Sequence, residues 1–225
     1  MSAHDNSPLV VAIDGPSGSG KSSVSKAVAR ALGAAYLDTG AMYRAITYAV
    51  LAAGTDLENQ DAVAEVVRAA ELEISVDPDH ELVRIGGEEV TQQIREPRIS
   101  ENVSAVATNL AARAELVRRQ QHVIAQHRRI VAEGRDITTV VAPDAQARIL
   151  LTASEAARMA RRGLQLGQTQ SAEDLAKQVL QRDAKDSTVV NFTQAADGVM
   201  TVDSSDLDFE QTIAAVLDAV ASTGN

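Results

Sequence analysis

Eight consecutive residues near the start of the chain have the types and spacing of a phosphate-binding loop. Residues 15–22 read Gly-Pro-Ser-Gly-Ser-Gly-Lys-Ser and match the pattern G-x-x-x-x-G-K-S/T at every fixed position. Glycines let the backbone approach an anion closely, and successive N–H groups at a helix N-terminus attract its charge. Lys21 is then placed to bridge the β- and γ-phosphates of a nucleoside triphosphate, and the Ser22 hydroxyl is placed to support Mg²⁺.

A second group of polar residues follows shortly afterwards. Residues 37–44 read Leu-Asp-Thr-Gly-Ala-Met-Tyr-Arg and come directly after a short apolar run. Arg44 can clamp a phosphate with two parallel hydrogen bonds, or it can be a solvated helix residue. Thr39 can bond a substrate, or it can simply cap the following helix. If the run is a strand parallel to the one before the loop, both polar groups lie at the same sheet edge, where ligands bind.

The elements that must position these residues alternate between strands and helices. Apolar runs at 10–13 and 35–37 predict buried strands, and each is followed by a helix, over 24–32 and 40–53. Gly33 predicts the end of the first helix. A strand–helix–strand–helix order is typical of a parallel sheet with helices on its faces.

The middle of the chain has a different pattern. A helix over 61–70 leads into short strands at 73–76, 81–85 and 88–90, with Gly86-Gly87 as a turn. We interpret residues 67–98 as an insertion that carries a small antiparallel sheet. After Pro97, apolar spacing predicts one long helix over 99–126.

The alternating pattern then resumes. We predict strands at 130–132, 149–151 and 198–202, which bring the parallel sheet to five strands, and helices over 154–166 and from Ser171 onwards. A final helix starts near Asp208, with Gln211 three residues later as in a capping box. The fold class is therefore α/β, a single phosphate-binding-loop domain.

Composition excludes several other kinds of function. The chain has no cysteine, which rules out disulfides, thiol nucleophiles and iron–sulfur clusters. It carries 21 Lys and Arg against 31 Asp and Glu, so its net charge of −10 disfavours nucleic acid and anionic membranes as partners. Aromatic residues make up only 2% of the chain, too few for a surface that stacks single-stranded bases.

The chain also has no run of apolar residues long enough to span a membrane, and residues 1–8 show no signal-peptide pattern. We therefore expect a cytoplasmic protein, and nothing in the sequence requires more than a monomer. A guanine-reading Asn-Lys-x-Asp tetrapeptide is absent. This absence, together with the compact length, favours a small-molecule kinase over a GTPase switch.

Four blocks of the sequence together resemble bacterial cytidylate (CMP/dCMP) kinases. They are Ile13–Ser23, Leu37–Arg44, Glu133–Val141 and Arg182–Ser187, and the resemblance extends from about residue 10 to 220. It implies ATP-dependent phosphorylation of CMP and dCMP with Mg²⁺, and a core of about 8–60, 99–152 and 195–225. It also implies a monophosphate-binding insertion of about 67–98 and a helical lid of about 154–192.

The resemblance also assigns roles to individual residues. Those implied to bind the triphosphate are Gly15, Pro16, Ser17, Gly18, Ser19, Gly20, Lys21, Ser22 and Ser23. Those implied on the monophosphate side are Asp38, Thr39, Tyr43 and Arg44, with Arg44 on the CMP phosphate. Ser104, Arg113 and Asp136 would read cytosine: a carboxylate or hydroxyl accepts the exocyclic amine, and a guanidinium donates to N3 and O2.

Further basic and acidic residues are implied around the transferred phosphoryl group. Arg135 would reach that group, although an ion pair with Asp136 or Glu133 is the alternative. Glu133 would hold Mg²⁺ through water. Arg182 would touch phosphate and Asp186 the ribose hydroxyl, although the two could instead form an exposed ion pair four residues apart.

The basic cluster Arg158, Arg161 and Arg162 falls within one predicted helix. It is either a solvated face or part of a lid that closes over ATP, and we assign the lid role to Arg162 and none to Arg158. The family also carries an arginine near Thr188-Val189, and this sequence does not. This difference leaves open the turnover rate and the preference between ribose and deoxyribose. The alternative functions are a kinase of UMP or of a shikimate-like acceptor, and a non-catalytic nucleotide-binding regulator.

Overall fold

The computed structural model describes residues 7–165 and 183–223. Its strands are β1 (Leu9–Asp14), β2 (Ala35–Asp38), β3 (Leu72–Ile74), β4 (Val83–Ile85), β5 (Glu88–Glu89), β6 (Arg129–Gly134), β7 (Ala147–Thr152) and β8 (Met200–Asp203). Its helices are α1 (Lys21–Leu32), α2 (Thr39–Ala52), α3 (Gln60–Ala69), α4 (Pro97–Ala107), α5 (Leu110–Ala125), α6 (Glu155–Gln165) and α8 (Phe209–Ser222). A 3₁₀ turn over Gln93–Arg95 and a π-helical segment over Ile137–Val141 are also present, and residues 183–186 are helical.

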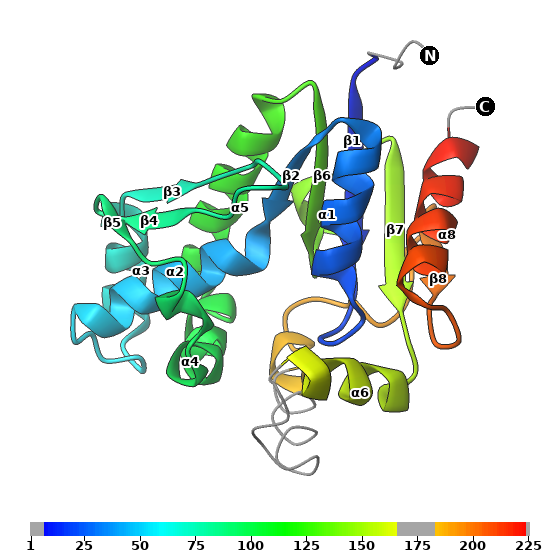
Figure 1. Cartoon of the computed structure of the whole chain (residues 1–225). Helices are drawn as coiled ribbons and strands as arrows, with labels where there is room; N and C mark the ends of the chain where they lie inside the picture. Colours follow the sequence, from blue (N-terminus) through cyan, green and yellow to red (C-terminus); the bar gives the residue numbers. More distant parts are fainter. Residues whose placement is uncertain (1–6, 166–182, 224–225) are drawn as a thin grey trace.

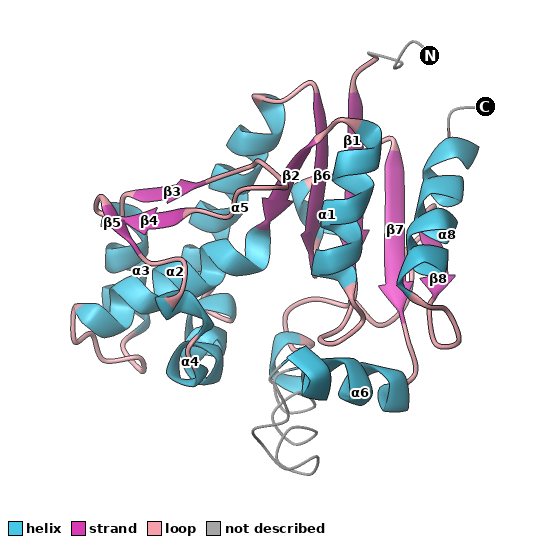
Figure 2. Ribbon diagram, in the orientation of Figure 1, coloured by secondary structure: helices cyan, strands magenta, loops and turns pink. Residues whose placement is uncertain are grey.

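A five-stranded parallel sheet forms the centre of the molecule, as predicted. The strand order is β2-β6-β1-β7-β8, and every neighbouring pair is parallel (Figure 2). β1 lies in the middle because its side chains are apolar on both faces: Val11 and Ile13 join one core, and Val10 and Ala12 join the other. The sheet therefore holds the start of the phosphate-binding loop at its centre.

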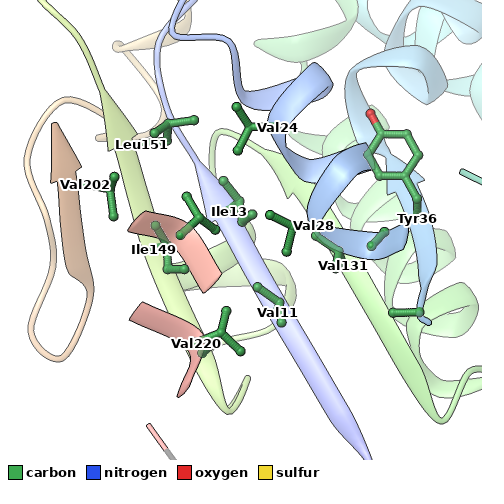
Figure 3. Packing of buried hydrophobic residues seen from close by; sticks show 14 residues of the cluster. Val11, Ile13, Val24, Val28, Tyr36, Val131, Ile149, Leu151, Val202 and Val220 are labelled. Carbon is green, nitrogen blue, oxygen red and sulfur yellow. The ribbon is translucent and has the colours of Figure 1, made fainter. Parts of the chain in front are cut away.

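Helices α1 and α8 cover one face of this sheet (Figure 1). Val24 and Val28 of α1 lie over Val11 and Ile13 of β1, and Val220 of α8 closes the same cluster (Figure 3). Burial of each such side chain contributes about 1.5–3 kcal/mol. The apolar stripe thus fixes α1, and with it Lys21 and Ser22 in its first turn.

Helices α2, α3 and α5 pack on the opposite face, around Leu37, Ile46 and Leu116. The three short strands β3, β4 and β5 form the separate antiparallel sheet that the sequence predicted, although each is shorter than expected. This sheet rests on α2 through a small cluster that includes Val83 and Ile94. It lies beside the central sheet rather than within it (Figure 2).

The prediction of one long helix over 99–126 is wrong. The chain forms α4 and α5, with a break at Thr108 and Asn109. The Asn109 side chain accepts a hydrogen bond from the Ala112 N–H at 3.0 Å and donates to the Gln60 carbonyl at 2.8 Å. Thr108 therefore ends α4 and Asn109 caps α5, a break that a pattern of apolar residues does not reveal.

Helix α6 crosses below the carboxyl ends of β1 and β7, near the phosphate-binding loop (Figure 1). The capping box predicted at the start of α8 is present, with Asp208 and Gln211 bonded to each other's backbone. The helix predicted from Ser171 lies outside the described residues. Among those that are described, no helix combines the length and apolar character that crossing a bilayer requires.

Candidate active site

The turn between β1 and α1 forms the phosphate-binding loop that the sequence predicts. Gly18 and Gly20 take positive φ values of 80° and 88°, which L side chains rarely adopt. A β-carbon on Gly15 would also lie only 2.2 Å from the Leu151 carbonyl oxygen of β7. The glycines of the pattern are therefore required by backbone shape and by close packing against the sheet.

A cleft of about 1120 Å³ opens in front of this loop. The predicted site residues that line it are Ser17, Gly18, Ser19, Gly20, Lys21, Ser22, Ser23, Asp38, Thr39, Tyr43, Arg44, Ser104, Arg113, Arg135, Asp136 and Asp186. Gly15 and Pro16 belong to the loop but do not line the cleft. Residues predicted from both the donor side and the acceptor side thus share one space, although they come from distant parts of the chain.

The start of α2 places a carboxylate and a guanidinium together in the cleft. Asp38, not Thr39, caps the helix, because its carboxylate accepts the Ala41 N–H at 2.7 Å. Arg44 pairs with Asp38 at 3.1 Å and is largely buried, so the solvated alternative for Arg44 is wrong. Burial alone would raise the pKa of Asp38, but the positive charge of Arg44 and the Ala41 N–H outweigh it and lower the pKa.

The Thr39 hydroxyl instead donates a hydrogen bond to the Glu133 carbonyl at 2.8 Å. This bond joins the start of α2 to β6. Gly134, the next residue, would place a β-carbon 2.5 Å from the Thr39 hydroxyl oxygen, so a side chain there would disrupt the junction. The second polar group of the sequence is therefore joined to the strand that carries Glu133, and Arg135 and Asp136 directly follow that strand.

Glu133 of β6 lines the cleft next to Ser22. Its carboxylate accepts the Ser22 hydroxyl at 2.6 Å and the Tyr36 hydroxyl at 3.3 Å. Burial, followed by the nearby negative charge of Asp38, raises the pKa of Glu133 to about 7. Oxygen ligands gathered in this way are the kind that Mg²⁺ prefers.

The residues implied to read cytosine also come together, across two elements and a loop. Arg113 of α5 donates to the Asp136 carboxylate at 2.6 Å, and Ser104 of α4 donates to Asp186 at 3.2 Å. Burial raises the pKa of Asp136, while the Arg113 charge opposes that shift. The cleft is thus lined by a carboxylate, a guanidinium and a hydroxyl from these three residues.

Arg135 forms neither of the ion pairs considered from the sequence. Its guanidinium instead pairs with Asp183 at 2.9 Å and with Asp186 at 2.5 Å, and it donates to the Ser17 hydroxyl at 2.7 Å. It also stacks on the Phe192 ring, with the guanidinium carbon 4.5 Å from the ring centre. Arg135 therefore lies in the cleft beside the phosphate-binding loop.

Two arginines of α6 have contacts that the sequence did not reveal. Arg158, to which we assigned no role, pairs with Asp183 at 2.6 Å and donates to the Ser17 carbonyl at 2.9 Å. Arg161 donates to the Ser19 carbonyl at 3.1 Å and to the Ser204 carbonyl at 2.6 Å. For these two residues the alternative of a solvated face is wrong, because α6 packs against the loop.

Two of the predicted catalytic arginines cannot be placed in this site. Arg162 belongs to α6, but its side chain lies outside the described part of the structure, and Arg182 lies outside it entirely. The alternative of an Arg182–Asp186 ion pair therefore remains a prediction.

Asp14, the last residue of β1, is a buried carboxylate that organises the site. It accepts the Ile137 N–H at 2.9 Å, the Thr138 N–H at 2.8 Å and the Thr138 hydroxyl at 2.6 Å. These bonds tie the end of β1 to the segment after Asp136. Burial raises the pKa of Asp14 from 3.8 to about 6, despite the bonds from Thr138 and Ile137 that lower it.

A parallel sheet with this loop at its centre, and a cleft that the loop shares with arginines and carboxylates, define a kinase of the phosphate-binding-loop class. The cytidylate kinase family model matches residues 11–222, almost the whole chain. The chain therefore belongs to the cytidylate kinase family and is a transferase, a nucleoside monophosphate kinase.

Individual relatives agree with this assignment. The chain is 49% identical to a cytidylate kinase of Cutibacterium acnes over 96% of its own length and 98% of that protein. It is 46% identical to a cytidylate kinase of Nocardia farcinica, covering 98% of each chain. The structure also resembles a gluconokinase of Sinorhizobium meliloti, with a TM-score of 0.51 at 15% identity over 96% of this chain and 93% of that one. At that identity the last likeness concerns the fold alone.

Proposed function

We propose that the cleft phosphorylates CMP and dCMP with ATP, giving ADP and CDP or dCDP, by in-line transfer of the terminal phosphoryl group. The observation that carries this proposal is that the phosphate-binding loop and the Ser104, Arg113 and Asp136 group line the same cleft. The loop suits a triphosphate, and the second group suits a cytosine ring. A donor and an acceptor bound at these two places would face each other.

In this proposal the phosphates are held by positive charge. The loop amides and Lys21 bind the triphosphate, and Arg44 binds the CMP phosphate. Arg135 lies in the same cleft beside Ser17, where it can stabilise the transferred group. The attacking phosphate oxygen is already anionic, so alignment and charge neutralisation supply the catalysis and no strong base is needed. Arg162 and Arg182 remain candidates for the same role.

Selection of the base follows from the Ser104, Arg113 and Asp136 group. Asp136 accepts the exocyclic amine of cytosine, while Arg113 donates to N3 and O2. Uracil has a carbonyl where cytosine has the amine, so it would meet the Asp136 carboxylate with repulsion. Asp186, held by Ser104 and Arg135, is assigned to the sugar hydroxyl.

The donor atoms around Ser22 fit a magnesium ion. The Ser22 hydroxyl and the Glu133 carboxylate meet at 2.6 Å, and within residues 7–165 and 183–223 no three His, Asp or Glu side chains form a closed cation cage. Mg²⁺ keeps waters and phosphate oxygens among its ligands, so few protein ligands suffice. When bound, the ion would neutralise charge on the β- and γ-phosphates.

The division of the chain into working parts is also proposed. Residues 67–98, which contain the antiparallel sheet, would enlarge the monophosphate-binding region. Residues 154–192 would form the lid, of which 166–182 lie outside the described structure. A monomer suffices for this scheme, since every residue assigned above comes from one chain.

A steady-state screen tests the proposed function. ADP release is measured with ATP and Mg²⁺ in the presence of CMP, dCMP, UMP, AMP or shikimate. We expect turnover with CMP and dCMP that exceeds turnover with UMP by at least tenfold. Equal or better turnover of UMP would contradict the assignment of Asp136, and ATP binding without ADP release would indicate a regulator instead.

A further inference from the structure

Asp183 is a buried carboxylate at the mouth of the phosphate-binding loop, and neither the sequence reasoning nor the proposed function gives it a role. One of its oxygens accepts the Ser17 N–H at 3.3 Å and Arg135 at 2.9 Å, and the other accepts Arg158 at 2.6 Å. Only 8% of the residue is exposed. A single side chain thus contacts the loop, the cleft arginine and helix α6.

These contacts belong to one electrically balanced group. Asp183 and Asp186 carry two negative charges, and Arg135 and Arg158 carry two positive charges, with 6–14% of each side chain exposed. Loss of one partner from a buried group of this kind leaves an uncompensated charge. Within the group, Asp183 is the residue that pairs with both arginines.

Phe192 contacts the same guanidinium from a different direction. Its side chain is almost completely buried, with 1% exposed, and its ring lies 4.5 Å from the guanidinium carbon of Arg135. The carboxylates of Asp183 and Asp186 contact the guanidinium nitrogens, which restricts rotation within the plane. The ring restricts the tilt of that plane, because guanidinium groups stack on aromatic faces.

We propose that Asp183 and Phe192 are positioning residues for phosphoryl transfer. Asp183 holds Arg135 and Arg158 against the phosphate-binding loop, and Phe192 fixes the plane of Arg135. The proposal rests on the proposed function in one respect, since it takes Arg135 to be the group that reaches the transferred phosphoryl. An arginine already oriented before the substrates bind loses less side-chain freedom in the transition state.

The test compares variants by kcat and by the KM for each substrate. Phe192→Leu removes the ring face but keeps an apolar side chain, and Asp183→Asn keeps an oxygen acceptor but removes the charge. We expect each to lower kcat about 10- to 100-fold, with both KM values changed less than threefold. Phe192→Tyr retains the ring face, so its kcat should lie above that of Phe192→Leu.

Two control variants separate positioning from general destabilisation. Asp218→Asn makes the same charge change at an exposed site on α8, and Val220→Ala removes buried methyl groups from the core far along that helix. Both should keep kcat within twofold, although Val220→Ala should lower the melting temperature. If Phe192→Leu is destabilised no more than Val220→Ala yet loses kcat, stability does not explain the loss.

A double-mutant comparison then tests the positioning role of Phe192 separately from the proposed role of Arg135. In a chain that already carries Arg135→Ala, Phe192→Leu should produce no further loss of kcat, because Phe192 acts through that guanidinium. A loss that multiplies with the Arg135→Ala loss would overturn the positioning role, and so would an unchanged kcat in both Phe192→Leu and Asp183→Asn. An Arg135→Ala chain with normal kcat would instead overturn the proposed role of Arg135 itself.

Discussion

Arg113 and Asp136 lie 23 positions apart in the chain, and their side chains meet at 2.6 Å inside the cleft. Arg113 comes from α5, and Asp136 follows β6 at the carboxyl edge of the sheet. The pair holds the carboxylate in a fixed orientation and opposes the effect of burial on its pKa. It thus couples the helical side of the cleft to the sheet at the place assigned to the base.

Asp136→Asn should reduce the preference for CMP over UMP. The amide side chain can donate to the uracil carbonyl, whereas the carboxylate only accepts, so the kcat/KM ratio of CMP to UMP should fall about 10- to 100-fold. The KM for ATP should change much less. Asp144→Asn, at an exposed position, is the control, and an unchanged ratio in Asp136→Asn would place base reading on other residues.

Lys21→Ala should remove a charge partner of the transferred phosphoryl group. Loss of one such partner typically lowers kcat by about 10²–10³-fold. Arg128→Ala removes an exposed positive charge outside the cleft and should leave kcat unchanged within twofold. A decrease of less than tenfold in Lys21→Ala would show that this side chain does not contact the reacting phosphates.

The fold was predictable because local patterns coincide with the architecture. The apolar run before Gly15 predicted β1 to within one residue at each end, and the stripe on the next helix predicted the end of α1 at Leu32, although α1 begins at Lys21 rather than at residue 24. The contacts of Arg158 and Asp183 were not predictable in this way. Spacing along α6 shows which residues share a face, but it does not show that this face packs on the phosphate-binding loop, which is a property of the tertiary fold.

The break at Asn109 yields a stability prediction. Asn109→Ala removes both the cap on Ala112 and the bond to the Gln60 carbonyl at a buried position, and the free energy of unfolding should fall by about 2 kcal/mol. Asn109→Ser keeps a cap acceptor without adding a buried charge, so its free energy of unfolding should fall by less. Urea denaturation measures both, and an unchanged midpoint for Asn109→Ala would mean that packing alone separates α4 from α5.

The buried carboxylate of Asp14 predicts how stability depends on pH. Its pKa is raised from 3.8 to about 6, so the folded state favours the protonated form more than the unfolded state does. The stabilisation that this difference gives is complete below pH 3.8 and disappears as the pH rises through about 6. The pKa shift corresponds to about 3 kcal/mol in the free energy of unfolding. We expect a measured loss of about 1–3 kcal/mol in that free energy as the carboxyl ionises.

Asp14→Asn isolates this contribution, because the amide does not titrate. The free energy of unfolding of both chains is measured by urea denaturation at pH 4.5, 6 and 7.5. At pH 4.5 the original chain should have its largest stability advantage over Asp14→Asn, since its protonated carboxyl still bonds to Ile137 and Thr138. That advantage should shrink as the carboxyl ionises at higher pH. A difference between the two chains that stays constant over this range would show that the folded-state pKa of Asp14 is not raised, and that the bonds from the segment after Asp136 are strong enough to hold a buried negative charge beside the phosphate-binding loop.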